Sequence, residues 1–476
     1  MNGSAVRLKL LETRFHERDV RLRMPFRFGV VTLREAPQAF VSARIQTEDG
    51  LEGWGMAAEL LAPKWFDKSP QLSNEQNFDQ LRQALAIAAR VYGSTSAWLS
   101  AFGLHAASAQ AHARACELAK LPPLVASFGT ALLDRAILDA LLRLMGTSVF
   151  AATRTNLFGL TAATTPDLKG FDFDAFLATL APAPMIAARH TVGMVDPIEV
   201  ADQTDDSRVG DGLPETLREV VQTYGVNHFK LKLGGDVDAD IDRLARIAAV
   251  IDSLPHYEAT LDGNEQYADA GAVIALWRRI EATPALQRLR AAILFIEQPI
   301  ARSHALENHI GELAALKPVE IDESDATIDS FLQARGLGYT GVSSKSCKGF
   351  YRSLLNRARC SSWNAGSAAE RFFMSAEDLT TQAGLAVQQD LALATLIGCT
   401  HIERNGHHYV DGMAAAPQHE QLAFLAAHPD IYRNDRGTVH LAITGGQIAI
   451  GSLDTPGLGS AVLPDTTAMS ERAYQV

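Results

Sequence analysis

The second half of this chain alternates regularly between apolar, strand-like runs and helical segments. The predicted strands span residues 188–194, 228–233, 258–264, 293–299, 319–324, 341–348, 371–378 and 400–405. Between them lie helical patterns; Ile241, Leu244, Ile247 and Ile251, for example, recur at three- and four-residue steps. Eight strand–helix units over roughly 220 residues match a (β/α)8-type barrel, which typically takes about 250.

An open, doubly wound sheet is the alternative that fits the same alternation. Such a sheet binds phosphate at a glycine-rich turn after its first strand. No GxGxxG or GxxxxGK[ST] motif marks that turn here. The sequence therefore favours an α/β fold with a (β/α)8-type barrel, in the manner of a modified TIM barrel.

The segments on either side of the barrel predict a second unit. Residues up to about 60 are rich in strand patterns, with a hairpin signal at Asp49-Gly50, and residues 73–147 are helical and rich in Ala and Leu. After residue 413 strands and turns return. We expect an α+β capping domain at 1–160, the catalytic barrel at 187–412, and a C-terminal segment at 413–476 that returns to the capping domain.

Composition narrows the class of partner. The formal net charge of −12 argues against nucleic acid or an anionic membrane surface as the main partner. The four cysteines form no CxxC pair, which is typical of a reduced, cytoplasmic protein. No uncharged apolar run reaches the roughly 18 residues of a membrane-spanning helix. We expect a cytoplasmic homo-oligomer with a small-molecule substrate, without nucleic acid or membrane partners.

Charged residues stand at or near the ends of five neighbouring predicted strands. In chain order they are Lys230 with Lys232, Asp262, Glu297, Asp322, and Lys345. In a parallel barrel the C-terminal strand ends converge on one site. A single carboxylate after a strand is usually a helix cap, and a lone KxK usually protects an edge strand. The regular recurrence of such residues favours one shared site over those separate explanations.

The residue types predict metal-assisted proton transfer. Three carboxylates from adjacent strands offer hard oxygen ligands that suit Mg2+ or Mn2+, and they would repel one another without a cation. Lys230 and Lys232 point to the same face of their strand, and the proximity of two ammonium groups lowers one pKa toward that of a general base. Lys345, three strands further round, can face the opposite side of the substrate.

An ordered set of motifs runs along the chain. It consists of PFRFG (25–29), EDGLEGWG (48–55), KLK (230–232), LDGN (261–264), IEQP (296–299), IDES (321–324), SKSCKG (344–349) and TPGLG (455–459). The set resembles the enolase superfamily, in the muconate-lactonizing-enzyme-like branch of the mandelate racemase/muconate lactonizing enzyme family.

That resemblance implies a role for each matching residue. Asp262, Glu297 and Asp322 would bind Mg2+, with Mn2+ also acceptable. Lys232 would be the base on one face of the substrate, with its pKa depressed by Lys230, and Lys345 the acid or base on the other face. Asn264 and Glu323 would support the metal ligands.

The implied reaction removes the proton alpha to a substrate carboxylate through an enediolate. Lysines on both faces favour a racemase or epimerase. Dehydration or another β-elimination, as in an o-succinylbenzoate-synthase-type step, and cycloisomerisation stay open. A non-catalytic protein on the same scaffold is less favoured, because all five lysine and carboxylate positions are present.

Departures from the family pattern bear on the substrate. Lys348-Gly349-Phe350 replaces the glycine pair that the family carries after the lysine of its sixth strand. The candidate substrate contacts are the polar residues Lys348, Glu377, Asp378, Glu403, Arg404 and Asn405. Loops near 28–34 and 56–65 are expected to close over the site, with Arg27, Arg34 and Lys64 as candidates for its distal part. A histidine base would have to come from His401, His407 or His408.

Overall fold

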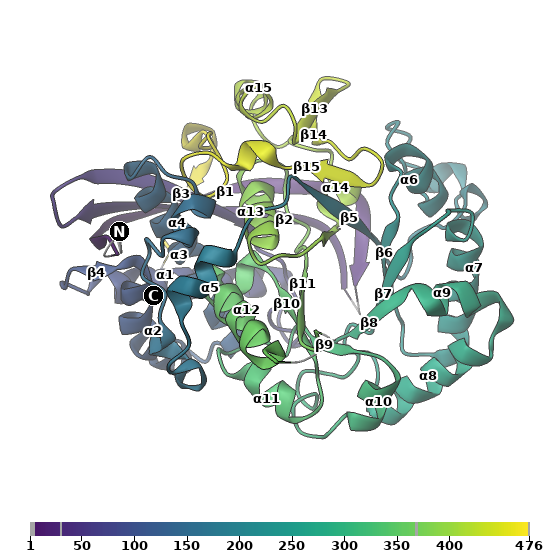
Figure 1. Ribbon diagram of the computed structural model, residues 1–476. Coiled ribbons are helices and arrows are strands. Elements are labelled where there is room, and N and C mark those ends of the chain that lie inside the picture. Colours follow the sequence, from purple (N-terminus) through teal and green to yellow (C-terminus); the bar gives the residue numbers. More distant parts are fainter. Residues whose placement is uncertain (1–4, 29–30, 367–369, 475–476) are drawn as a thin grey trace.

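Eight parallel strands form a closed barrel in the computed structural model (Figure 1), which describes residues 5–28, 31–366 and 370–474. The strands are β5 (Met185–Val192), β6 (His228–Lys232), β7 (Glu258–Asp262), β8 (Ile293–Glu297), β9 (Val319–Ile321), β10 (Gly341–Ser344), β11 (Phe373–Ala376) and β12 (His401–Arg404). Each pairs with the next, and β12 pairs with β5 to close the ring. The predicted barrel is confirmed, with strand bounds that shift by a few residues.

Helices surround the barrel and cover the outer faces of its strands (Figure 1). They are α6 (Leu217–Tyr224), α7 (Val237–Ile251), α8 (Ala270–Ala282), α9 (Gln287–Ala292), α10 (Gly311–Leu316), α11 (Ser330–Gly336), α12 (Phe350–Asn364) and α13 (Leu385–Leu396). In α7 the side chain of Asp236 caps the first turn by accepting the N–H of Ala239. The apolar positions that predicted this helix, Ile241 and Leu244 among them, are buried.

The N-terminal segment forms an antiparallel sheet backed by helices. Strands β1 (Arg7–Phe28), β2 (Val31–Thr47) and β3 (Glu52–Leu60) lie side by side, and the short β4 (Leu99–Ser100) pairs with β1. Helices α1 (Asn74–Gly93), α2 (Ala101–Leu118) and α3 (Pro123–Leu144) pack together, with α3 against β2 and β3. Two short helices, α4 (Val149–Arg154) and α5 (Phe173–Thr179), follow. This unit is the predicted α+β cap.

Close backbone approach explains the GWG part of the hairpin motif. A side chain at Gly55 would overlap the backbone of Ala136 and Ala140, so only glycine lets β3 lie directly against α3. In the same helix, α3, the buried carboxylate of Asp139 accepts the N–H of Met56 at 3.0 Å and that of Leu458 at 2.8 Å. One carboxylate thus joins the hairpin to the TPGLG segment.

The C-terminal segment contacts both units. After the short α14 (Gly406–Tyr409), which follows β12, it contains α15 (Gln418–Ala427), β13 (Tyr432–Asp435), β14 (Thr438–Leu441), β15 (Gln447–Ala449) and β16 (Ser470–Glu471). Strand β15 pairs antiparallel with β5 of the barrel, whereas β16 pairs with β1 of the cap, at His16 opposite Glu471. Beyond β16 the ring of Tyr474 stacks on Phe15 with centroids 4.7 Å apart.

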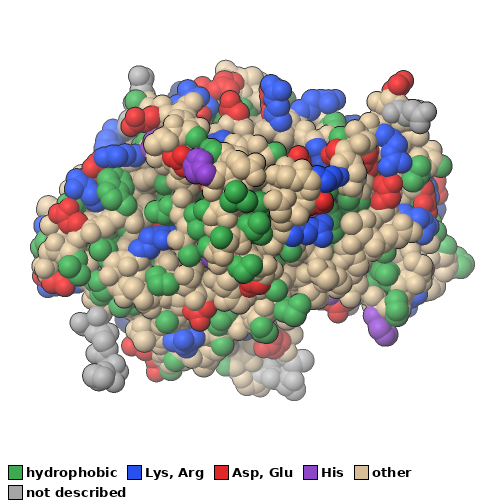
Figure 2. Space-filling model, turned by 90° about the horizontal axis from the view of Figure 1, so that it is seen from above, with side chains coloured by type: hydrophobic (Ala, Val, Ile, Leu, Met, Phe, Trp, Pro, Cys, Tyr) green, Lys and Arg blue, Asp and Glu red, His purple; other side chains and the backbone are tan. Residues whose placement is uncertain are grey.

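On the face shown in Figure 2 acidic and basic side chains are interspersed rather than gathered by sign. Within the described ranges, no helix combines the length and the apolar character needed to cross a bilayer.

Candidate active site

The charged residues singled out by the sequence meet at the C-terminal edge of five neighbouring barrel strands. Lys230 and Lys232 end β6, Asp262 ends β7 and Glu297 ends β8. Strand pairing sets Lys232 opposite Asp262, and Asp262 opposite Glu297. Asp322 and Lys345 directly follow β9 and β10, respectively. The convergence follows from the parallel register, which brings equivalent strand ends to one rim.

Ion pairs connect these lysines and carboxylates. Lys232 Nζ lies 2.5 Å from an oxygen of Asp262. Lys230 Nζ lies 3.1 Å from Asp262 and 2.7 Å from Glu297. Lys345 Nζ lies 2.9 Å from Asp322. All of these side chains are buried, so the attractions act in a medium of low polarity and are strong.

The pKa values of the lysines follow from these contacts. Burial lowers the pKa of Lys232 and so does the charge of Lys230, but Asp262, together with Glu403 and Glu297, holds the pKa above its ordinary value. Burial lowers the pKa of Lys345 as well, but Asp322, together with Glu377 and Glu403, holds it above the ordinary value. The sequence predicted that Lys230 would lower the pKa of Lys232 toward neutrality. Lys230 does lower it, but the neighbouring carboxylates, which that prediction left out, raise it by more.

A second layer of charge lies deeper in the barrel. Lys230 Nζ also contacts Glu377 at 2.6 Å and Glu403 at 3.1 Å, and Arg189 of β5 pairs with Glu377. Glu320 stands two residues before Asp322 on β9 and so points to the same interior face, one step further from the rim. Burial and Glu377 raise its pKa well above the ordinary value.

The buried carboxylates offer two places to look for a cation. Among the described residues, the one group whose ligand atoms all lie within 4.8 Å of one another is Glu297, Glu320 and Glu377. Arg189 and Lys230 already contact that group. At the rim, Asp262, Glu297 and Asp322 supply hard oxygen ligands but stand further apart, each holding a lysine. A cation there would displace lysine ammonium groups and draw the carboxylates together.

Oxygen atoms near the rim support a fit to a hard cation such as Mg2+. The side-chain Oδ1 of Asn264 is buried without a hydrogen-bond partner, and so is one oxygen of Glu323. Asn264 donates its backbone N–H to Asp262 and its side-chain N–H to Glu323, which links the two predicted supporting residues to the rim. Burial and the charge of Glu265 raise the pKa of Glu323 to about 7.

A small cavity of about 30 Å3 lies over these groups. Its polar wall consists of Lys230, Lys232, Asn264, Asp322, Lys345, Asp378, Thr380, Glu403 and Asn405. Lys232 and Lys345 thus face one space from β6 and β10, with β7, β8 and β9 between them. The volume holds a water molecule or two but no organic acid.

Three of the six predicted substrate contacts line the active-site cavity, and the other three lie elsewhere. Asp378, Glu403 and Asn405 line the cavity. Glu377 belongs to the deeper charge layer, and Lys348 Nζ contacts Asp325 at 3.2 Å and Ser343 Oγ at 2.8 Å. Arg404 pairs with Asp390 and lines a different cavity.

The roof of the active-site cavity is apolar. It is made of Phe26, Leu33, Ala62, Trp65 and Leu379, none of which the sequence had marked as a site residue. The ring of Trp65 lies 5.2 Å from Lys345 Nζ, within cation–π range.

The charged cap residues lie elsewhere. Arg27 and Arg34 are exposed, and Lys64 Nζ donates to the backbone carbonyls of Ser69 and Leu72. Residues 29 and 30 of the expected closing loop lie outside the described residues.

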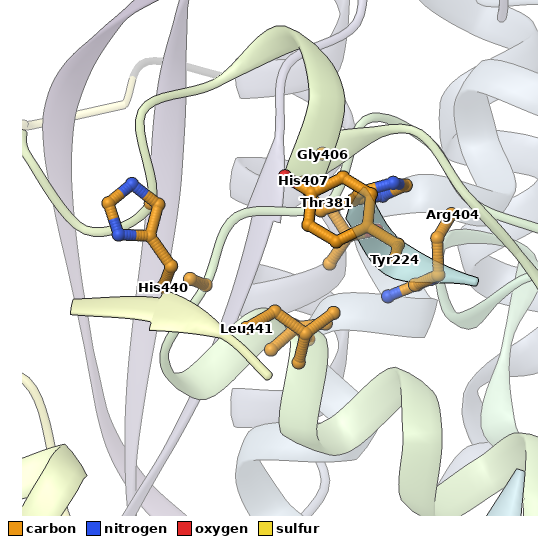
Figure 3. Close-up of a pocket in the computed structure, with 10 residues that line it drawn as sticks. Tyr224, Thr381, Arg404, Gly406, His407, His440 and Leu441 are labelled. Carbon is orange, nitrogen blue, oxygen red and sulfur yellow. The ribbon is translucent and has the colours of Figure 1, made fainter. Parts of the chain in front are cut away.

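The histidines lie away from the described cavity lining. His401, at the start of β12, contacts Arg189 at 2.7 Å. His407 lines a separate space of about 20 Å3 behind β12, where Figure 3 shows Arg404, Tyr224 and Leu441 around it. Both ring nitrogens of His407 are buried without a partner, and burial holds its pKa well below the ordinary value. One water molecule would fit that space.

A comparison with family models identifies the chain. The model described as enolase C-terminal domain-like matches residues 212–466, more than half of the sequence. The chain belongs to this family. The predicted enolase superfamily membership, and with it the prediction of an enzyme, is confirmed. No curated protein matches the chain.

Solved structures of the enolase superfamily share the whole architecture. Dipeptide epimerase from Enterococcus faecalis, complexed with Mg and the dipeptide L-Leu-L-Tyr, matches with a TM-score of 0.58 and 15% identity over 95% of this chain and 99% of that one. L-Ala-D/L-Glu epimerase from Bacillus subtilis gives 0.55 and 15%, over 95% and 98%. A mandelate racemase/muconate lactonizing protein from Herpetosiphon aurantiacus gives 0.56 and 16%, over 95% and 98%. At this identity the likeness shows the shared fold.

Proposed function

We propose that this enzyme removes the proton alpha to the carboxylate of a small organic acid and returns a proton to the same carbon, as a racemase or epimerase. The observation that carries the proposal is the position of Lys232 and Lys345, which face one cavity from two separated strands. A base and an acid so placed can reach opposite faces of a planar enediolate. The similar epimerase folds support this reaction class.

The rim carboxylates Asp262, Glu297 and Asp322 would hold the metal, for which we propose Mg2+, with Mn2+ as an alternative. When bound, the ion supplies positive charge that favours the doubly charged form of the substrate carboxylate. The fit rests on the hard oxygen donors described above and agrees with the Mg complexes of two similar structures. The chain's own contribution is to bury these donors beside two lysines.

Lys232 can act as the base once Asp262 no longer holds it protonated. Asp262 is the carboxylate that raises the pKa of Lys232 most, whereas burial and Lys230 both lower it. A change of partner at Asp262 therefore shifts the balance toward the neutral amine, against the smaller influence of Glu403 and Glu297. Lys345, held by Asp322, delivers or takes the proton on the other face.

The apolar roof indicates the kind of acid. Phe26, Leu33, Trp65 and Leu379 would contact the substituent on the α-carbon, so we propose an uncharged, largely apolar group there. Elimination is the second candidate reaction, because Asp378, Glu403 and Asn405 place polar atoms on the wall where a leaving hydroxyl would need them. The proposed partner is therefore a small carboxylate in either case.

Exchange in D2O tests the proposal. The full-length protein with Mg2+ is incubated with single enantiomers of a panel of carboxylic acids, and loss of the α-proton signal is followed by proton NMR. Lys232→Ala should abolish exchange of one enantiomer, and Lys345→Met that of the other. The exposed Lys169→Ala is the matched control. Racemisation in D2O replaces the α-hydrogen by deuterium and keeps every other atom of the acid, whereas elimination lowers its mass by that of the leaving group.

Two results would contradict the assignment. The first is a Lys232→Ala, Lys345→Met double variant that still exchanges the α-proton at the rate of the unmodified enzyme. The second is a panel in which no acid exchanges, although the protein is folded and saturated with Mg2+.

A further inference from the structure

A second and much larger cavity lies between the cap and the barrel. It measures about 690 Å3, within the range of small-molecule sites. Helices α2 and α3 form one side, and the residues that follow β9 and the start of α12 form the other. It shares no lining residue with the active-site cavity. The fold therefore offers a separate space large enough for an organic ligand.

Arg352 brings a positive charge to this cavity. Its guanidinium donates a hydrogen bond to the backbone carbonyl of Asp325 at 2.7 Å. Within the described ranges, no carboxylate oxygen lies in ion-pair distance of it. Burial lowers the pKa of Arg352 below its ordinary value, and the charge of Asp325, beyond ion-pair distance, offsets that effect only in part.

Tyr351 and His105 also line this cavity. Tyr351 is 1% exposed, and its buried hydroxyl has no hydrogen-bond partner. The ring of His105 packs on Tyr351 with centroids 5.3 Å apart. His105 Nδ1 lies 2.7 Å from Asp134, which fixes the ring and leaves Nε2 for another partner. A buried hydroxyl without a partner costs free energy unless a ligand or water satisfies it.

Of the other charged residues in the lining, Lys348 and Asp134 are held by partners, whereas Glu117 and Lys120 stand at exposed positions at the end of α2 and just after it. Lys348 pairs with Asp325 at 3.2 Å and reaches Asp322 at 3.5 Å, so it forms a wall between the two cavities rather than a free cation. Asp134 holds His105 and also accepts the hydroxyl of Tyr92. Most of the other lining is apolar, with Leu121 and several alanines and prolines from α2, α3 and the turn between them.

We propose that this cavity is a second binding site, for an organic acid whose carboxylate meets Arg352 and Tyr351 and whose apolar body lies against α2 and α3. A planar guanidinium matches a carboxylate in shape as well as in charge. The site is independent of the proton-transfer reaction proposed above, because it uses none of that reaction's residues.

The experiment is a calorimetric titration of phenylacetate into the full-length protein, with a chelator present so that no divalent ion supports binding at the barrel rim. Arg352→Gln and Tyr351→Phe remove the polar contacts. Ala113→Trp fills the mouth from an exposed position on α2, and Ala111→Trp, exposed on the same helix but outside the lining, is its matched control. Lys345→Met reports on binding in the active site.

We expect saturable binding that weakens about tenfold or more in Arg352→Gln and Ala113→Trp, and less in Tyr351→Phe. Ala111→Trp and Lys345→Met should bind phenylacetate as the unmodified protein does. The proposal is overturned by an absence of saturable binding, by loss of binding in Lys345→Met, or by equal binding of inorganic phosphate or neutral 2-phenylethanol.

Discussion

Replacing Lys230 by methionine should destabilise the fold far more than the same change at Lys232. Lys230 Nζ stands within 3.1 Å of four buried carboxylates, those of Asp262, Glu297, Glu377 and Glu403. Methionine keeps the length and much of the volume of the side chain but removes its charge. Leaving a buried ion without its partner costs about 3–5 kcal/mol, and we expect a loss of unfolding free energy of that size.

Lys232→Met is the matched control. Lys232 contacts one carboxylate, that of Asp262, and its loss also relieves repulsion from Lys230. We therefore expect a change of about 1 kcal/mol together with loss of proton exchange. The assay is urea unfolding of each variant, followed by tryptophan fluorescence, with and without Mg2+. Mg2+ should stabilise Lys230→Met more than the unmodified protein, because the ion no longer competes with that ammonium group.

Equal stability of the two variants would refute the reasoning. So would a Lys230→Met protein that is as stable as the unmodified enzyme in the presence of a chelator. In either case the buried carboxylates would have to be protonated or hydrated, and Lys230 would not be their main counter-charge.

Three further predictions follow from other contacts. Rigorous chelation should abolish α-proton exchange and added Mg2+ should restore it; exchange that is unaffected would reject the metal role. Gly55→Ala should cost about 3 kcal/mol by forcing β3 away from α3, whereas Gly93→Ala, which has open space around it, should leave the urea midpoint unchanged or higher. Burial lowers the pKa of His112 to about 4 and that of His190 to about 3, so the unfolded chain takes up these protons first as pH falls. Stability present at neutral pH should therefore decline from about pH 6.5 downward, by about 3 kcal/mol for His112 alone; a flat profile from pH 7 to 4 would contradict this.

The barrel was predictable because its signals are local and repeated. The eight strands are short, largely buried runs, and some are followed by a residue whose side chain begins the next helix, as Asp236 begins α7 and Asp269 begins α8. Parallel register then brings the strand ends together without any knowledge of side-chain contacts. The bounds were less predictable: β9 stops at Ile321, whereas the predicted strand ran on to residue 324.

Each cap residue predicted to contact the substrate lies one position away from a residue that lines the cavity. Arg27, Arg34 and Lys64 were candidates for the distal site, but the cavity is lined by their chain neighbours Phe26, Leu33 and Trp65. Arg27 and Arg34 lie in the strands β1 and β2, where successive side chains point to opposite faces, so the charged residue of each pair takes the solvent face and the apolar one the inward face. Lys64 differs, because it lies in a turn with a positive φ and donates to backbone carbonyls.

The sequence contains a pattern that could have indicated the deeper charge layer. Glu320 precedes Asp322 by two residues, and Glu403 lies two residues after His401, so both alternate onto the interior face of their strands. What the sequence could not show is the pairing of Lys230 with four carboxylates at once. That arrangement depends on side chains from β6, β7, β8, β11 and β12, which only the closed barrel brings together.

The pairing of β16 with β1 has a consequence for how the chain is made. The hydroxyl of Tyr474 donates to Glu17, 457 residues away along the chain. During synthesis the strand that completes the cap sheet leaves the ribosome after all eight barrel strands. The barrel can therefore assemble while its cap is still unfinished, and contacts of such long range form slowly. Newly made molecules should therefore pass through a stage in which the cap sheet still lacks β16 beside β1.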